Sequence, residues 1–81
     1  MLDYSNILKE TKEYYLKNIK KEDKDNIPEE IVIMQLYNLI LNILNQQMFD
    51  YVYIFKREDL ELLIKYNINI VDLINEFKKY I

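Results

Sequence analysis

Residues 31–49 of the chain read IVIMQLYNLILNILNQQMF and contain no charged side chain. At 100° per residue, the angle of an α-helix, five of the polar side chains fall within about a third of the circumference. These five, which we call the amide strip, are Gln35, Asn38, Asn42, Asn45 and Gln46, while Gln47 lies outside the arc. Nearly all other positions are apolar. The pattern predicts a long helix that is apolar around most of its circumference.

A helix start signal precedes this stretch at residues 26–30, NIPEE. Proline is tolerated in the first turn of a helix, and the two carboxylates suit the positive end of the helix dipole. We therefore expect the long helix over residues 28–49. Residues 50–55, DYVYIF, favour a strand by propensity. Because no second strand is available to pair with it, we prefer a continuation of the helix or an extended connector, with a strand as the alternative.

Residues 3–21 and 70–81 have the apolar spacing of one helix face. We expect another helix over residues 57–66, where the charges of Glu58 and Asp59 suit the first turn. In residues 3–21, Asp3 or Ser5 is a candidate N-cap, and the apolar face comprises Tyr4, Ile7, Leu8, Tyr14, Tyr15 and Ile19, with Thr11 on the same arc. In residues 70–81, the apolar stripe comprises Ile70, Leu73, Ile74, Phe77 and Ile81, with Val71 at its edge. Residues 67–69, NIN, predict a turn between the last two helices, because asparagine tolerates left-handed backbone geometry and caps helices.

These patterns predict one all-α domain over residues 1–81, a small bundle of three or four helices around a long central apolar helix. A domain of this size buries only about 60% of the surface that its unfolded chain exposes, so its stability margin is thin. Three short helices are few to cover so wide an apolar arc. We therefore expect a homodimer in which a second copy completes the core.

The composition excludes most catalytic chemistry. The chain has no histidine, no cysteine and no glycine, which removes thiol catalysis, a histidine base, the usual zinc sites and glycine-rich phosphate loops. Ser5 and Thr11 are the only aliphatic hydroxyls, and no histidine can activate them. The carboxylate pairs Glu10 with Glu13 and Glu58 with Glu61 have the spacing of ordinary helix surfaces. We expect no enzyme activity, no cofactor and no metal.

The charge-free stretch is just long enough to raise the question of a membrane span. Six of its nineteen residues are Asn or Gln, however, and unpaired amides are costly in hydrocarbon. We therefore expect no membrane insertion. Residues 1–10 lack the features of a secretory signal, so we expect a cytoplasmic protein.

Nucleic-acid binding is the alternative function. The net charge of −3 comes from residues 26–55, and the segments on either side are balanced. A lysine face on the first helix, comprising Lys9, Lys17, Lys20, Lys21 and Lys24, would allow a dimeric nucleic-acid-binding regulator. The last two helices have the outline of a helix-turn-helix, but Asp72 and Glu76 on the outer side of the second argue against reading DNA.

The amide strip has two interpretations. It is either the solvated side of a central helix or a contact surface, because charge depletion is typical of the buried centre of an interface. We expect a protein partner on this strip and on Tyr51 and Tyr53, since tyrosine offers a large contact area at low entropy cost. Half of the chain is Ile, Lys, Asn or Tyr, whose codons are rich in A and T. We therefore expect a small regulator or inhibitor from a phage, plasmid or virus that binds and occludes a larger protein.

Overall fold

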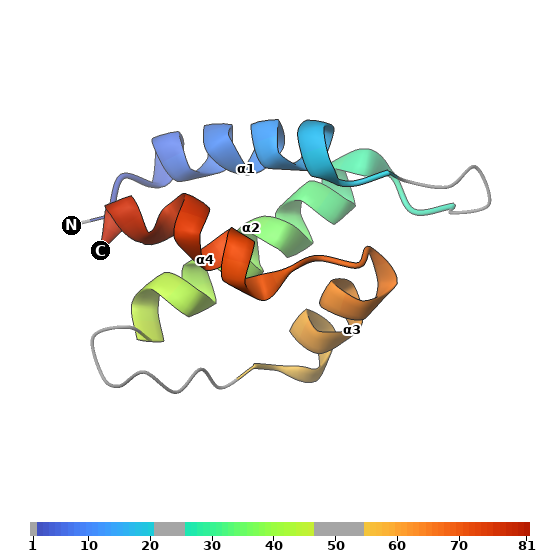
Figure 1. The fold of residues 1–81 in the computed structure, drawn as a ribbon. Helices are drawn as coiled ribbons and strands as arrows, with labels where there is room; N and C mark the ends of the chain where they lie inside the picture. The colour runs from blue at the N-terminus through green and yellow to red at the C-terminus, as the bar shows by residue number, and fades with distance from the viewer. Residues whose placement is uncertain (1, 21–25, 47–54) are drawn as a thin grey trace.

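The computed structural model describes residues 2–20, 26–46 and 55–81. Within these ranges the chain forms helices and no strand (Figure 1). The α-helices are α1 (Tyr4–Asn18), α2 (Glu29–Gln46), α3 (Arg57–Lys65) and α4 (Ile70–Phe77), followed by the short 3₁₀ helix η1 (Lys78–Tyr80). The prediction of an all-α fold is confirmed.

Helix α2 packs against each of the other three α-helices. In Figure 1, α4 crosses α2 and lies between α1 and α3, and the two ends of the chain lie on the same side of the molecule. The buried residues of α2 are Val32, Ile33, Leu36, Leu39, Ile40, Ile43 and Leu44. One chain therefore covers this side of α2 without help from a second copy.

The start of α2 follows the signal in the sequence. The helix begins immediately after Pro28, whose carbonyl accepts a hydrogen bond of 3.0 Å from the backbone N–H of Ile31. Its described part ends at Gln46. Residues 47–49 of the predicted helix, and residues 50–54 of the ambiguous segment, lie outside the described residues. Phe55, the last of that segment, is neither helix nor strand.

Helix α1 is capped as expected and ends slightly early. The Asp3 carboxylate accepts a hydrogen bond of 3.1 Å from the backbone N–H of Asn6, which satisfies one of the free donors of the first turn. Thr11 is fully buried, and its hydroxyl donates 2.6 Å to the carbonyl of Ile7. The helix ends at Asn18, not near residue 21, because the backbone of Ile19 is extended.

The turn between α3 and α4 confirms the prediction made from its asparagines. Asn67 has φ of 51°, in the left-handed region that asparagine enters more readily than other non-glycine residues. The side chain of Asn69 then caps α4 by accepting hydrogen bonds from Val71 N (3.0 Å) and Asp72 N (3.2 Å). Two asparagines thus end one helix and begin the next without glycine.

The end of the chain departs from the expected helical stripe. Leu73 and Phe77 are buried as predicted, but Ile81 is 57% exposed. The reason is that the α-helix gives way to the 3₁₀ helix at Lys78, so the positions after Phe77 no longer follow the α-helical spacing. Tyr80 takes the place expected for Ile81, with its ring stacked on Phe77 at a centroid distance of 6.3 Å.

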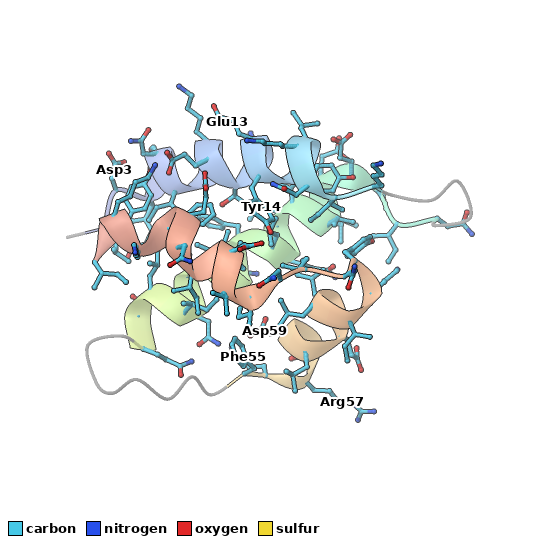
Figure 2. The ribbon with its side chains drawn as sticks, in the orientation of Figure 1. Asp3, Glu13, Tyr14, Phe55, Arg57 and Asp59 are labelled. Carbon is cyan, nitrogen blue, oxygen red and sulfur yellow. The ribbon has the colours of Figure 1, made fainter. Side chains whose placement is uncertain are left out.

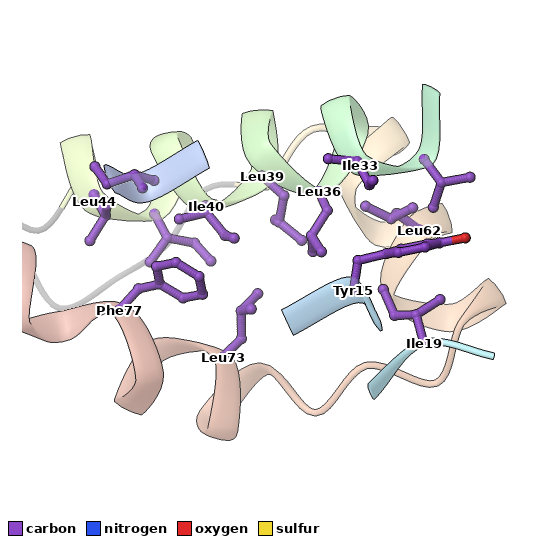
Figure 3. Close-up of a cluster of buried hydrophobic side chains, with 13 residues drawn as sticks. Tyr15, Ile19, Ile33, Leu36, Leu39, Ile40, Leu44, Leu62, Leu73 and Phe77 are labelled. Atoms are coloured by element: carbon purple, nitrogen blue, oxygen red, sulfur yellow. The ribbon is translucent and has the colours of Figure 1, made fainter. Parts of the chain in front are cut away.

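The core is one cluster that joins all four α-helices (Figure 3). More than half of its buried side chains belong to α2. Leu73 and Phe77 point from α4 toward α2 in Figure 3. The rings of Tyr14 in α1 and Phe77 form a T-shaped contact with a centroid distance of 6.4 Å. The exposed side of α2 is therefore fixed in space by the packing of its buried side.

Candidate functional site

The amide strip lies on the open side of α2. Gln35, Asn38 and Asn45 are exposed, while Asn42 and Gln46 are half-buried. The same side continues toward the start of the helix with Ile31 and Met34, which are 48% and 46% exposed. Because residues 31–46 contain no charge, α2 presents a continuous uncharged surface to solvent.

A groove runs along this surface, between α2 and the first turn of α3. Its volume is about 590 Å³. One wall is formed by Gln35, Asn38, Asn42 and Asn45 together with Leu41, and the other by Lys56, Glu58 and Asp59. Four of the five predicted strip residues therefore line one concave site.

The two walls are joined by a short chain of hydrogen bonds. Asn42 Nδ2 donates 3.2 Å to Asp59 Oδ2, and Gln46 Nε2 donates 2.7 Å to Asn42 Oδ1. Asp59, labelled in Figure 2, lies in the first turn of α3. The amide of Asn42 is thereby oriented from both sides, so its position in the groove is fixed.

Asp59 combines burial with a negative charge. It is 8% exposed. Among the described residues, the only other buried polar residue is Thr11, which is neutral. Its place in the first turn of α3 is favourable, because the N-terminal end of a helix attracts negative charge. A buried carboxylate bonded to a neutral amide gives this wall of the groove a fixed, acceptor-rich point.

A second groove lies between α1 and α4 and is strongly acidic. It has a volume of about 500 Å³ and is lined by Glu10, Glu13, Tyr14, Lys17, Asn18, Asp72, Asn75 and Glu76. Burial raises the pKa of the Tyr14 hydroxyl, and the charges of Asp72 and Glu76 raise it further. Phosphate groups would be repelled from this surface, since four carboxylates face one lysine.

At the edge of this second groove, Glu10 ties α1 to the C-terminal 3₁₀ helix. Lys79 Nζ lies 2.6 Å from Glu10 Oε1, and the Tyr80 hydroxyl donates to Glu10 Oε2. Burial alone would raise the pKa of Glu10, but these two hydrogen bonds outweigh it and the pKa is lowered. Burial and the hydrogen bond to Glu10 raise the pKa of Tyr80 to about 12. This cluster links residues that are far apart in sequence.

One member of each carboxylate pair seen in the sequence is bonded to another residue in the fold. Glu10 is bonded to Lys79 and Tyr80, and Glu61 forms an exposed ion pair of 3.3 Å with Arg57. In the part of the chain that the structure describes, no group of three or more acidic, histidine or cysteine residues is placed to hold a metal ion. None of the helices described there is long and apolar enough to cross a membrane.

The sequence predicted the polar site residues on the α2 wall of the groove but not those on the α3 wall. Tyr51 and Tyr53, also expected at the contact surface, lie outside the described residues. Glu58 and Asp59 were expected in the first turn of a helix, where their charges suit the helix dipole, and Lys56 was expected just before it. No sequence signal shows that Asp59 is buried against Asn42, because that depends on how α3 packs on α2.

Comparison with protein-family models, with curated proteins and with solved structures found no match for the chain.

Proposed function

We propose that this chain is a small non-enzymatic protein-binding module, a regulator or inhibitor that occludes part of a larger protein. We place the contact on the amide strip of α2 and the groove beside it. The observation that carries the proposal is the exposed, uncharged surface from Ile31 to Asn45, in a chain in which 31% of all residues are charged.

Removing water from charged side chains costs more than removing it from amides. Covering a lysine or glutamate in an interface requires a partner charge, whereas an amide needs only a hydrogen bond. The outer side of α1 is the internal contrast, because it exposes Lys9, Lys12, Glu13 and Lys17. A surface kept neutral along four helical turns, with exposed Ile31 and Met34 at one end, has the chemistry of a buried interface centre.

The expected homodimer remains a prediction with a weaker basis. It was inferred from an apolar arc that we expected to be too wide for one chain to cover. In the structure, however, the other helices of the same chain cover the buried side of α2. The uncharged surface would still allow two copies to meet without repulsion. Light scattering after gel filtration distinguishes one chain from two.

The surroundings of Lys17 oppose nucleic-acid binding by the lysine face, of which Lys21 and Lys24 lie outside the described residues. Lys17 shares the α1–α4 groove with Glu10, Glu13, Asp72 and Glu76. These carboxylates oppose the approach of a phosphate backbone. We therefore do not propose this role, and titration with duplex DNA at low salt tests it directly.

The experiment for the proposed function is affinity capture from extracts of the source cells. Asn38→Lys puts a charge in the middle of the uncharged surface, and Leu16→Lys, at a position of α1 that is 72% exposed, is the matched control. We expect the wild type and Leu16→Lys to retain the same protein and Asn38→Lys to lose it, with both variants folded by circular dichroism. Equal capture by all three, or no captured protein, would contradict the proposal.

A further inference from the structure

We infer that the occupant of the α2–α3 groove is an extended segment of the partner protein that carries a lysine or arginine. In this arrangement the strip amides bond to the main chain of the segment, and Asp59 receives its cationic side chain. The inference rests on the proposed function and names the chemistry of the partner.

The length of the groove suits a short extended chain. Gln35 and Asn45 are ten residues apart on α2, which corresponds to about 15 Å of helix rise. An extended segment of about five residues spans the same 15 Å.

The amides of the strip match a peptide main chain. Each Asn or Gln side chain offers one carbonyl and two N–H donors, so it can pair with the N–H and C=O of a peptide unit. Gln35, Asn38 and Asn45 are exposed and follow one another at three- and seven-residue steps along one side of α2. Such contacts hold a main chain whatever its side chains, and so set its position more than its sequence.

Asp59 supplies the preference for a cation. It is buried, negative, and bonded through Oδ2 to the neutral amide of Asn42. With Glu58 and Lys56, the α3 wall of the groove has two negative charges and one positive charge. A buried charge is usually paired with an opposite charge, and a lysine or arginine of the occupant provides that pair. An acidic segment would be repelled at the same point.

The test uses three pools of N-acetylated, C-amidated hexapeptides. The third position is Lys, Glu or Ser, and the other positions are mixtures of Ser, Thr, Val and Ile. The side-chain NH₂ signals of Gln35, Asn38 and Asn45 in NMR spectra report binding at the groove itself. We expect the Lys pool to shift these signals and the Glu pool to leave them unchanged. Asp59→Asn should weaken binding of the Lys pool about tenfold, to the level of the Ser pool.

The result that overturns the inference is a Lys pool that leaves these signals unchanged or binds no better than the Glu pool. Shifts that grow with protein concentration in the absence of peptide would also overturn it, because the occupant would then be a second copy. If Asn38→Lys loses the protein that the wild type captures but the peptides do not bind, the proposed function stands and only the proposed occupant of the groove is wrong. If the wild type and Asn38→Lys capture a protein equally well, the proposed function itself fails. Asp59→Asn is checked for an unchanged circular dichroism spectrum before use.

Discussion

The Asn42 side chain in α2 donates a hydrogen bond of 3.2 Å to the Asp59 carboxylate in α3, 17 residues further along the chain. This bond joins the amide strip to the one charged residue that is buried within the described ranges. It therefore connects the stability of the α2–α3 packing with the shape of the candidate binding groove. Changes at either residue should affect both.

We predict energetic coupling between Asn42 and Asp59. Asn42→Ala leaves a buried carboxylate without this donor, which should lower the free energy of unfolding by about 1–3 kcal/mol. In a double-mutant cycle with Asp59→Ala, the coupling energy should be about 1 kcal/mol by urea unfolding. Asn38→Ala, at an exposed strip position, is the control and should change stability by less than about 0.5 kcal/mol. Additive effects of the two substitutions would show that the bond contributes nothing.

We predict that Leu39 is essential for the core. Its side chain is fully buried, so Leu39→Ala should cost about 2–5 kcal/mol through lost burial and the cavity left behind. A domain of this size has a total stability of about 5–15 kcal/mol, so the variant should be largely unfolded at moderate urea. Met34→Ala, on the open side of the same helix, should cost much less. Similar urea midpoints for the two variants would show that the core is misplaced.

We predict an acid-sensitive contribution from Glu10. Its folded-state pKa is lowered below the ordinary value of 4.5, so its stabilising effect is present above that pH and is lost as the pH falls through the folded-state pKa. The stability difference between the wild type and Glu10→Gln should therefore shrink on acidification from about pH 6. Urea unfolding at a series of pH values measures it. A difference that does not change with pH would contradict the hydrogen bonds from Lys79 and Tyr80.

We predict that the Tyr80 hydroxyl loses its proton only at unusually high pH, because it is partly buried and bonded to Glu10. Burial and the bond to Glu10 raise its pKa to about 12, so the stabilisation linked to its hydroxyl is present below pH 10.0 and lost as the pH rises through the raised value. The Tyr80 transition is isolated as the difference between the ultraviolet titrations of the wild type and Tyr80→Phe. In a Glu10→Gln background this transition should move down toward 10.0, and an unmoved transition would show that Glu10 is not a cause.

We predict that the turn at Asn67 depends on its left-handed backbone. Asn67→Ala should cost about 1 kcal/mol, because alanine is strained at φ of 51°. Asn67→Gly should be close to neutral or better, since glycine adopts this geometry without strain. Thermal unfolding of the two variants checks the order. A more stable alanine variant would be inconsistent with this backbone geometry.

Features that depend on neighbours along the chain could be predicted from the sequence. The start of α2 after Pro28, the cap at Asp3 and the turn at Asn67 follow from hydrogen bonds over three or four residues or from the preference of one residue. The prediction for Ile81 was wrong because the helix tightens after Phe77, and the apolar spacing does not show such a change.

The sequence by itself predicted a helix over residues 28–49, with a buried apolar side and, from residue 31 onward, an uncharged open side. Spacing at 3.6 residues per turn places side chains on faces without reference to the rest of the fold. Only the tertiary structure decided that Asp59 is buried opposite Asn42 and that Lys79 and Tyr80 meet Glu10. These contacts join residues 17 to 70 positions apart, and they form only when hydrophobic burial sets how the helices cross.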